Sequence, residues 1–390
     1  MEVIHKKAEA LKEELVEIRH DIHQHPELGF EEYRTTKLIK KELKKENIKI
    51  EPLETETGVL AVIKGEKPGD KVIALRGDMD ALPIEEKTNL EYKSKNKGVM
   101  HACGHDGNTT VLLVTAKLLN SIKDKFSATV KFIFQPAEET LVGSESMLKA
   151  GVLENPHVDN IVGIHGWPYI EVGKIGVWSG PYMASADKFT VKMKGSGGHG
   201  AYPHESVDPV LAASTAVVEL QNIVSRRIDA LEKTVLSVCT LNGGKAFNVI
   251  PEEVEFSGTV RCHSNEVRDG IESKIDTILK GVATSFNCDY ELNYEYGVPP
   301  VINDPKVIEK VSEAAGQVLG EGHVEKLDKP AMSSEDFSNY LKEVPGAFIR
   351  LGIKDPESDK SLTLHNDHFD FNDDAIPFGV SVLSQYVLNQ

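Results

Sequence analysis

The chain has 390 residues, a formal net charge of −17 at pH 7, 40% hydrophobic residues and 27% charged residues. This length exceeds what a single hydrophobic core usually fills, so two domains are expected. The acidic balance argues against nucleic acids and anionic membranes as partners, because both are recognised by basic surfaces. The N-terminal segment lacks a long apolar run, so we expect neither a signal peptide nor a transmembrane helix.

The cysteines are scattered, at Cys103, Cys239, Cys262 and Cys288. This spacing is typical of reduced thiols and not of a disulfide framework, so we expect a cytoplasmic protein. Only Cys103 has neighbours of the kind that bind metals. The other three thiols are interpreted as core residues or exposed bystanders.

The first half of the chain predicts alternating helices and strands. Residues 5–24 carry Leu and Ile at helical spacing, Pro26 ends that helix, and a second helix is expected over 31–45. Strands are expected at 58–64, 71–75, 128–134 and 160–164, with a buried helix at 109–121. This alternation predicts an α/β fold whose mostly parallel sheet has helices on both faces. The active site of such a sheet gathers at the carboxyl ends of its strands.

The pattern changes near residue 184, where polar and apolar residues begin to alternate. The expected elements are a strand at 188–194, a loop at 195–204, a helix at 208–224, strands at 234–241 and 253–261, a helix at 266–286 and a strand at 289–296. This β-α-β-β-α-β order predicts a small α+β domain of ferredoxin-like type. We therefore predict a catalytic domain in two parts, residues 1–183 and 297–390, interrupted by an inserted domain at 184–296.

The stretch from Gly98 to Thr110 holds the clearest chemical signal. Cys103 and His105 lie two residues apart, and thiolate and imidazole are good ligands for a metal such as zinc. A single Cys-Gly-His is weak evidence because short patterns recur by chance. The hypothesis depends on further acid and imidazole sites that each end an apolar run of their own.

Two pairs of acids follow predicted strands. Glu138 and Glu139 come after a Gln-Pro-Ala turn, and consecutive residues on extended backbone point to opposite sides. One carboxylate could therefore bind metal while the other acts as a base. Asp78 and Asp80 end a buried strand, where they could be turn acids. We assign Asp80 to orienting a ligand histidine, with Asp78 as the weaker candidate.

Two histidines also end short apolar runs. His165 follows residues 161–164, and His365 follows residues 362–364. A lone histidine in such a place is more often a hydrogen-bonded core residue than a ligand. His368 competes with His365, and spacing alone does not choose between them.

Seven motifs occur in the order found in one known family. They are Arg76-Gly-Asp-Met-Asp-Ala-Leu-Pro83, His101-Ala-Cys-Gly-His-Asp106, Gln135-Pro-Ala-Glu-Glu139, Gly197-Gly-His-Gly-Ala-Tyr-Pro-His204, Asn248-Val-Ile-Pro251, Ser334-Glu-Asp-Phe337 and Leu364-His365. From about residue 10 to its end, the chain closely resembles the amidohydrolase branch of the metal-dependent aminoacylase and carboxypeptidase family. That branch includes hippurate hydrolases, auxin-conjugate hydrolases and N-acetyldiaminopimelate deacetylases.

The resemblance implies a site with two divalent metal ions. Zinc and manganese are the first expectation, and cobalt and nickel also suit such ligands. The implied ligands are Cys103, which bridges the two ions, with His105, Glu139, His165 and His365.

The resemblance also implies roles for the residues around the metals. Glu138 would be the general acid/base, and Asp80 would lie behind a ligand histidine. The inserted domain would be a lid that also forms a homodimer or homotetramer. His199 in that lid would polarise the scissile carbonyl, and Asn248 and Arg261 would hold the substrate carboxylate. A guanidinium suits a carboxylate, although Arg261 could instead form a surface salt bridge.

The chain departs from the family pattern at two positions. Asn108 stands where many relatives carry histidine, and Ser333 stands where glycine is common. Neither is an implied ligand, so the expected chemistry is unaffected. The two differences do mean that the substrate of this chain need not be that of its relatives.

The expected reaction is hydrolysis of the amide bond of a small N-acyl amino acid. A dipeptidase or aminopeptidase acting on short peptides with the same site is the first alternative. The second is a metal-dependent binding protein, which would have no need of a base such as Glu138. The third is a cysteine hydrolase that uses Cys103 with a histidine.

Overall fold

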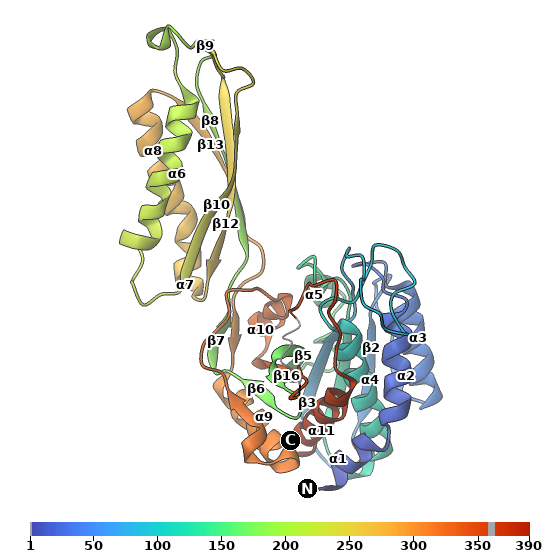
Figure 1. Cartoon of the computed structure of the whole chain (residues 1–390). Helices are drawn as coiled ribbons and strands as arrows, with labels where there is room; N and C mark the ends of the chain where they lie inside the picture. The colour runs from blue at the N-terminus through green and yellow to red at the C-terminus, as the bar shows by residue number, and fades with distance from the viewer. Residues whose placement is uncertain (1, 358–362) are drawn as a thin grey trace. The chain divides into compact units, whose positions relative to one another are not determined.

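The computed structural model describes residues 2–357 and 363–390, and these form two compact units (Figure 1). Unit 1 contains the described residues of 1–180, 302–330 and 336–390. Unit 2 contains residues 181–301 and 331–335. Within the described residues, the helices are too short or too polar to span a bilayer.

Unit 1 is built on an eight-stranded sheet of order β1-β2-β4-β3-β5-β16-β6-β15. The strands are β1 (Lys49–Glu51), β2 (Val59–Lys64), β3 (Val72–Asp78), β4 (Thr129–Gln135), β5 (Asn160–Glu171), β6 (Ile175–Val177), β15 (Val324–Lys326) and β16 (Gly346–Lys354). The four central strands β4, β3, β5 and β16 are parallel, whereas β1 and β2 join antiparallel. The predicted mostly parallel sheet is therefore confirmed.

Helices complete unit 1. They are α1 (Glu2–Glu9), α2 (Lys12–His23), α3 (Tyr33–Lys45), α4 (His105–Ser121), α5 (Gly143–Lys149), α9 (Pro305–Leu319), α10 (Tyr340–Glu343) and α11 (Ile376–Leu388). Every residue of β3 is buried, and α4 is buried from His105 to Leu119. A strand with no exposed side reads as a continuous apolar run, which is why the sequence identifies β3 easily.

Unit 2 contains the four-stranded antiparallel sheet β10-β12-β8-β13. Its elements are β8 (Asp187–Lys194), α6 (Pro209–Arg226), β10 (Thr234–Gly243), β12 (Glu253–Cys262), α7 (Asn265–Asp269), α8 (Ile271–Phe286) and β13 (Asp289–Glu295). The predicted β-α-β-β-α-β order is confirmed. A separate hydrophobic core includes Phe189, Leu220, Phe256 and Leu279, so this unit has an interior of its own.

Two short strand pairs were not predicted. Strand β9 (Gly198–His199) pairs with β11 (Val249–Ile250), within a stretch expected to be loop. Strand β7 (Gly180–Met183) pairs with β14 (Val301–Asn303). Strands this short carry too little hydrophobic pattern to be recognised from sequence.

Four predicted boundaries were wrong. The first helix is interrupted between α1 and α2, and nothing in the local composition marks that break. The helix expected at 266–286 is divided at Gly270, a residue type that weakens helices. Helix α4 begins four residues earlier than expected, at His105. Strand β5 continues to Glu171, so His165 lies inside the strand and not beyond its end.

Candidate active site

The predicted ligands of unit 1 converge at one edge of the parallel strands. Strand β3 ends at Asp78, β4 ends at Gln135, and α4 begins at His105. Carboxyl ends of adjacent parallel strands lie at the same edge of a sheet, so the loops that follow them meet there. The cluster thus follows from the order of the central strands.

Three overlapping groups of side chains each lie within 4.8 Å, measured between potential ligand atoms. They are Cys103, His105 and His165; Cys103, Glu139 and His365; and His105, Glu138 and Glu139. The Cys103 Sγ is 3.5 Å from His165 Nε2. The His365 Nε2 is 3.4 Å from Glu139 Oε1. Cys103, His105 and Glu139 each belong to two of these groups, and Cys103 is the member shared by the group with His165 and the group with His365.

The ring of His105 is oriented by Asp80. Its Nδ1 lies 2.9 Å from the Asp80 backbone oxygen and 3.1 Å from Oδ1. The other carboxylate oxygen of Asp80 accepts a hydrogen bond from the Glu139 backbone N–H at 2.9 Å. Asp80 therefore contacts two of the candidate ligands, in the way that carboxylates support metal-binding histidines.

The cluster contains buried polar atoms suited to a cation. Among the residues that the structure describes, neither His105 Nε2 nor Glu139 Oε1 has a hydrogen-bond partner. Buried polar atoms are normally hydrogen-bonded, so an exception calls for an unseen partner. With thiol, imidazole and carboxylate groups together, the donor set fits zinc and similar transition metals.

Burial and neighbouring charges shift the pKa values of these groups. Burial raises the pKa of the Cys103 thiol to about 12 and lowers the pKa of His165 to about 3. Burial opposes ionisation of Asp78, but the charges of His105 and Arg76 hold the pKa of its carboxyl well below the usual range. A Cys103 thiolate at neutral pH therefore needs an adjacent cation, as in metal binding.

The backbone at Glu138 and Glu139 differs from the expected extended conformation. The two residues lie in a turn, and the Leu141 N–H donates to the Glu138 carbonyl at 2.7 Å. Ala137 has a left-handed φ of 54°. The prediction that the two carboxylates point to opposite sides is therefore wrong, because both lie near His105. Glu138 is 6% exposed, so it is a buried acid within the cluster.

The structure places His365 and His368 differently. The His365 N–H donates to the Ala102 carbonyl at 2.8 Å, which ties this residue to the segment that carries Cys103. The Nδ1 of His368 instead lies 2.6 Å from Asp367 Oδ1. Only His365 belongs to the ligand groups. Leu362, part of the apolar run expected before His365, lies outside the described residues.

Sequence reasoning missed a buried network behind the site. Arg76 donates to Asp78 at 2.6 Å and to Asp336 at 3.0 Å, and Gln135 donates to Asp336 at 2.8 Å. Asn108 donates to Asp78 at 2.8 Å and accepts from the Gly166 N–H at 2.9 Å. Arg76, directly after the apolar run of β3, is the signal that could have revealed this network, because a buried arginine requires carboxylate partners.

The candidate residues of unit 2 lie in two separate places. His199 on β9 pairs with Val249 on β11, which places Asn248 beside it, and the Gly200 N–H donates to the Asn248 carbonyl at 2.9 Å. Arg261 is near the far end of β12, roughly 25 Å from the end that adjoins β9 at the usual rise per residue. Its Nη1 donates to the Ser334 hydroxyl at 2.8 Å.

Comparisons with known proteins agree with this geometry. The chain is 40% identical over 370 residues to an N-acetyl-L-cysteine deacetylase of Bacillus subtilis, covering 94% of this chain and 85% of that protein. It is 39% identical over 380 residues to the hippurate hydrolase of Campylobacter jejuni, covering 97% of each. A dinuclear metal-binding peptidase of the M20 family from Bacillus subtilis superimposes with a TM-score of 0.86 at 36% identity, covering 98% of both chains. Residues 74–389 match the profile of peptidase family M20/M25/M40, and the chain therefore belongs to that family.

Proposed function

We propose that the chain is a metal-dependent amidohydrolase that cleaves the amide bond of N-acyl amino acids. The observation that carries this proposal is the convergence of Cys103, His105, Glu139, His165 and His365 next to the buried acid Glu138. Relatives that are 39–40% identical over nearly the whole chain are a deacetylase and a hydrolase of such compounds. A binding protein would not need an additional acid beside a complete ligand set.

The ligand groups support a centre of two divalent ions, with Cys103 shared by the group that contains His165 and the group that contains His365. Bound there, the ions would polarise the scissile carbonyl and lower the pKa of the attacking water. Zinc and manganese are the first candidates, with cobalt and nickel as further ones, because availability often decides among metals that suit the same ligands.

Glu138 is the proposed general acid/base. Its carboxylate takes the proton of the attacking water and then donates it to the nitrogen of the leaving amine, releasing a carboxylic acid and a free amino acid. Asp80 holds His105 in the tautomer that directs Nε2 into the site. His199 is proposed to stabilise the negative charge that develops on the carbonyl oxygen.

Unit 2 overlaps the inserted domain that the sequence predicts at residues 184–296. We propose that this domain acts as a lid and as the dimerisation domain. Asn248 and Arg261 are the candidate contacts for the substrate carboxylate. Arg261 lies near one end of β12, whereas Asn248 precedes β11 near the other end, so one small substrate can reach both only if two copies of the chain contribute. This separation supports a homodimer, with a homotetramer as the alternative.

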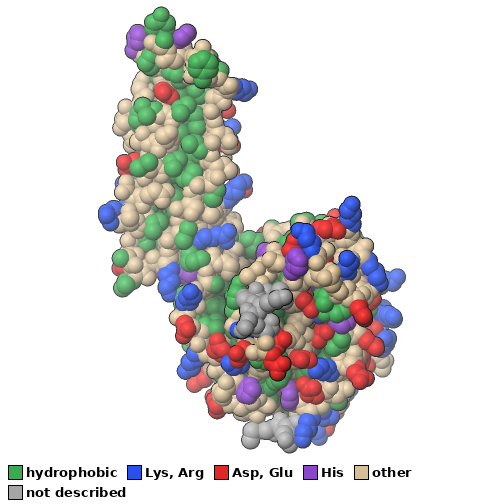
Figure 2. Space-filling view, viewed as in Figure 1, with side chains coloured by type: hydrophobic (Ala, Val, Ile, Leu, Met, Phe, Trp, Pro, Cys, Tyr) green, Lys and Arg blue, Asp and Glu red, His purple; other side chains and the backbone are tan. Residues whose placement is uncertain are grey.

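Figure 2 shows hydrophobic side chains along one face of unit 2. Helix α6 carries the exposed hydrophobic side chains Val210, Leu211 and Val218, and Val218 is 67% exposed. An apolar face of this kind fits a contact between protein subunits. We further propose a cytoplasmic location, since the described cysteines are all free thiols.

A substrate panel tests the proposed activity. Purified protein, loaded separately with zinc, manganese, cobalt and nickel, should hydrolyse N-acetyl and N-benzoyl amino acids faster than dipeptides. Chelation should abolish turnover, and added metal should restore it. Faster cleavage of dipeptides would favour the peptidase alternative. Activity that survives chelation but not thiol alkylation would instead indicate a cysteine hydrolase.

A further inference from the structure

Arg19 is a fully buried cation on α2 that contacts three carboxylates. Its Nε donates to Asp106 at 2.8 Å, one terminal nitrogen donates to Asp370 at 2.5 Å, and the other donates to Asp373 at 2.8 Å. The guanidinium also lies 5.0 Å from the centre of the Tyr92 ring. Among these three ion pairs, the Arg19 and Asp106 side chains are both fully buried, and Asp370 and Asp373 are about one quarter exposed.

The three carboxylates belong to two of the segments that carry candidate metal ligands, namely those with Cys103 and His105 and with His365. Asp106 follows His105 at the start of α4. Asp370 and Asp373 lie on residues 366–374, the segment that leaves His365 and leads to α11. Arg19 thus joins these two segments through one side chain, although it belongs to neither of them.

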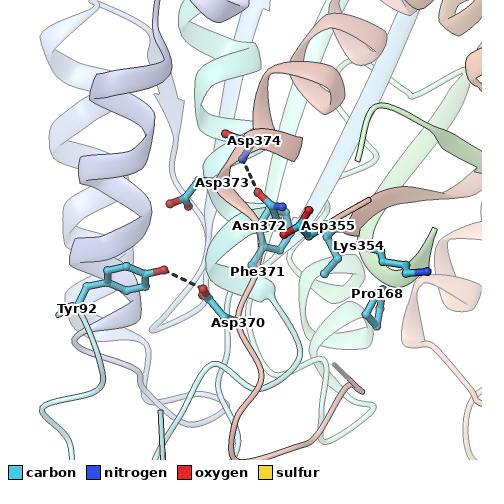
Figure 3. Close-up of a pocket in the computed structure, with 10 residues that line it drawn as sticks. Tyr92, Pro168, Lys354, Asp355, Asp370, Phe371, Asn372, Asp373 and Asp374 are labelled. Atoms are coloured by element: carbon cyan, nitrogen blue, oxygen red, sulfur yellow. Dashed lines mark hydrogen bonds between the residues drawn. The ribbon is translucent and has the colours of Figure 1, made fainter. Parts of the chain in front are cut away.

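Figure 3 shows how the second segment is held. The Tyr92 hydroxyl donates to Asp370 at 2.9 Å. Phe371 packs against the start of α4 so closely that a Cβ at Gly107 would lie 2.4 Å from its ring. Gly104 has a φ of 89° and a Phe371 atom 3.0 Å from its would-be Cβ, so a side chain is excluded there as well. The segment after His365 therefore has one closely defined position on α4.

We propose that Arg19 is a positioning residue for His365, and that it fixes the spacing between this ligand and Cys103 and Glu139. The proposal rests on the metal centre proposed above. Arg19 touches no ligand atom, so its effect would be transmitted through Asp370 and Asp373 on one side and Asp106 on the other. Other groups share these carboxylates: Tyr92 donates to Asp370, His20 lies 2.8 Å from Asp373, and His23 lies 2.8 Å from Asp106.

Two other cations bind the same segment, but both are exposed. Lys12 pairs with Asp374 at 2.7 Å and Lys87 pairs with Asp367 at 2.6 Å. Exposed pairs gain little because water and salt screen them. Removing Arg19 instead leaves the fully buried Asp106, and the partly buried Asp370 and Asp373, without their main counter-charge, which disfavours the observed arrangement. Arg19 is therefore the cation whose loss is expected to displace residues 366–374.

Loss of Arg19 is expected to weaken the binding of one metal ion and not the other, because the two ligand groups that share Cys103 differ in their other members. One group contains His365 with Glu139, whereas the other contains His105 with His165. Displacing His365 should weaken one ion and spare the other. Arg19→Lys keeps the charge but cannot bind three carboxylates as a planar fork. We expect this variant to bind one zinc ion as tightly as the wild type and the second about 10–100-fold more weakly, the usual effect of losing a residue that supports a ligand.

The experiment measures zinc bound per chain after gel filtration, and zinc affinity by competition with a chelator, in the wild type and in Arg19→Lys. Lys12→Met is the matched control, because it removes an exposed anchor of the same segment and should leave both ions in place. Circular dichroism and thermal unfolding show whether each variant is folded. If Arg19→Lys does not fold, Asp370→Asn removes one contact and should weaken the second ion in the same direction.

The outcomes separate this proposal from the proposed function. Two zinc ions bound with unchanged affinity in folded Arg19→Lys, or in folded Asp370→Asn where it takes its place, would overturn the positioning role while leaving the dinuclear centre intact. Equal weakening of both ions would also overturn it, since only one ligand group contains His365. A wild-type protein that binds no second ion would refute the dinuclear centre itself.

Discussion

The carboxylate of Glu32 accepts a hydrogen bond from the backbone N–H of Ala137 at 2.8 Å, and Glu32 is fully buried. Ala137 adopts a left-handed φ of 54°, which costs free energy in any residue that has a side chain. The backbone of Gly29 supports the same turn, because a Cβ there would lie 3.1 Å from the Ala137 Cα. A segment near the N-terminus thus holds the turn that presents Glu138 and Glu139.

Removing the Glu32 acceptor should disturb that turn. We expect Glu32→Ala to lower kcat about tenfold or more and to destabilise the protein by about 1–3 kcal/mol, because a buried N–H loses its partner. Glu32→Gln keeps an acceptor oxygen and should retain most of the activity. Steady-state kinetics and denaturant unfolding measure both effects. Equal losses of kcat and of stability in the two variants would show that the charge of Glu32, and not its hydrogen bond to Ala137, supports the turn.

Glu32 should also make the stability of the metal-free protein depend on pH. Burial, reinforced by the charge of Asp80, raises the pKa of Glu32 to about 7. In the unfolded chain the pKa is near 4.3, so the folded state binds the proton more tightly. This contribution to stability is fully present below about pH 4 and is lost as the pH rises through 7.

Urea denaturation of the wild type and Glu32→Gln at several pH values between 4 and 8 measures this dependence. The stability of the wild type relative to the variant should fall by about 1–3 kcal/mol across that range. A constant difference would mean that Glu32 keeps an ordinary pKa in the folded protein.

Glu138 is expected to be essential for turnover but not for holding metal. Glu138→Gln and Glu138→Ala should each lose about 10²–10⁴-fold in kcat, the range of general acid/base catalysis. Metal content should stay near that of the wild type, since both three-residue groups that contain Cys103 remain. Full metal loading with nearly normal turnover would rule out the acid/base role.

Asp80 should control metal affinity through two contacts. It orients His105 at 3.1 Å and accepts from the Glu139 N–H at 2.9 Å. We expect Asp80→Asn to weaken metal binding about 10–100-fold. The amide of asparagine is uncharged and has a single acceptor oxygen, so it cannot accept from both His105 and the Glu139 N–H as the carboxylate does. Asp276→Asn, at an exposed acid that pairs with Tyr290, is the control. Titration with zinc against a chromogenic chelator compares the two, and equal affinities would contradict the orienting role.

Two glycines should respond in opposite ways to alanine. A Cβ at Gly143 would lie 1.7 Å from the Pro136 carbonyl oxygen, so Gly143→Ala must displace the turn that carries Glu138. A Cβ at Gly281 on α8 would meet nothing within 4 Å. Gly281→Ala should therefore stabilise unit 2 by about 0.5–1 kcal/mol through better helix propensity. The midpoint temperature of thermal unfolding should be lower for Gly143→Ala than for the wild type, and it should not be lower for Gly281→Ala.

The sequence alone determined the main helices and strands and the side chains available for chemistry, although it missed the short strands β7, β9, β11 and β14. Continuous apolar runs identified β3 and β4 because a strand covered on both faces has no polar side, and alternation identified the strands of unit 2. The family motifs named all five implied ligands before any distance was known. These features are local, so they can be read from neighbouring residues.

Only the tertiary structure decided which residues meet. It placed His365 and not His368 beside Glu139, put Glu138 and Glu139 in a turn held by Glu32, and separated Arg261 from His199 and Asn248. It also joined Arg19 to Asp370 and Asp373 across more than 350 residues of sequence. No local pattern encodes such contacts, because they arise from the order in which strands and helices pack, and buried charges reveal their partners only once the chain is folded.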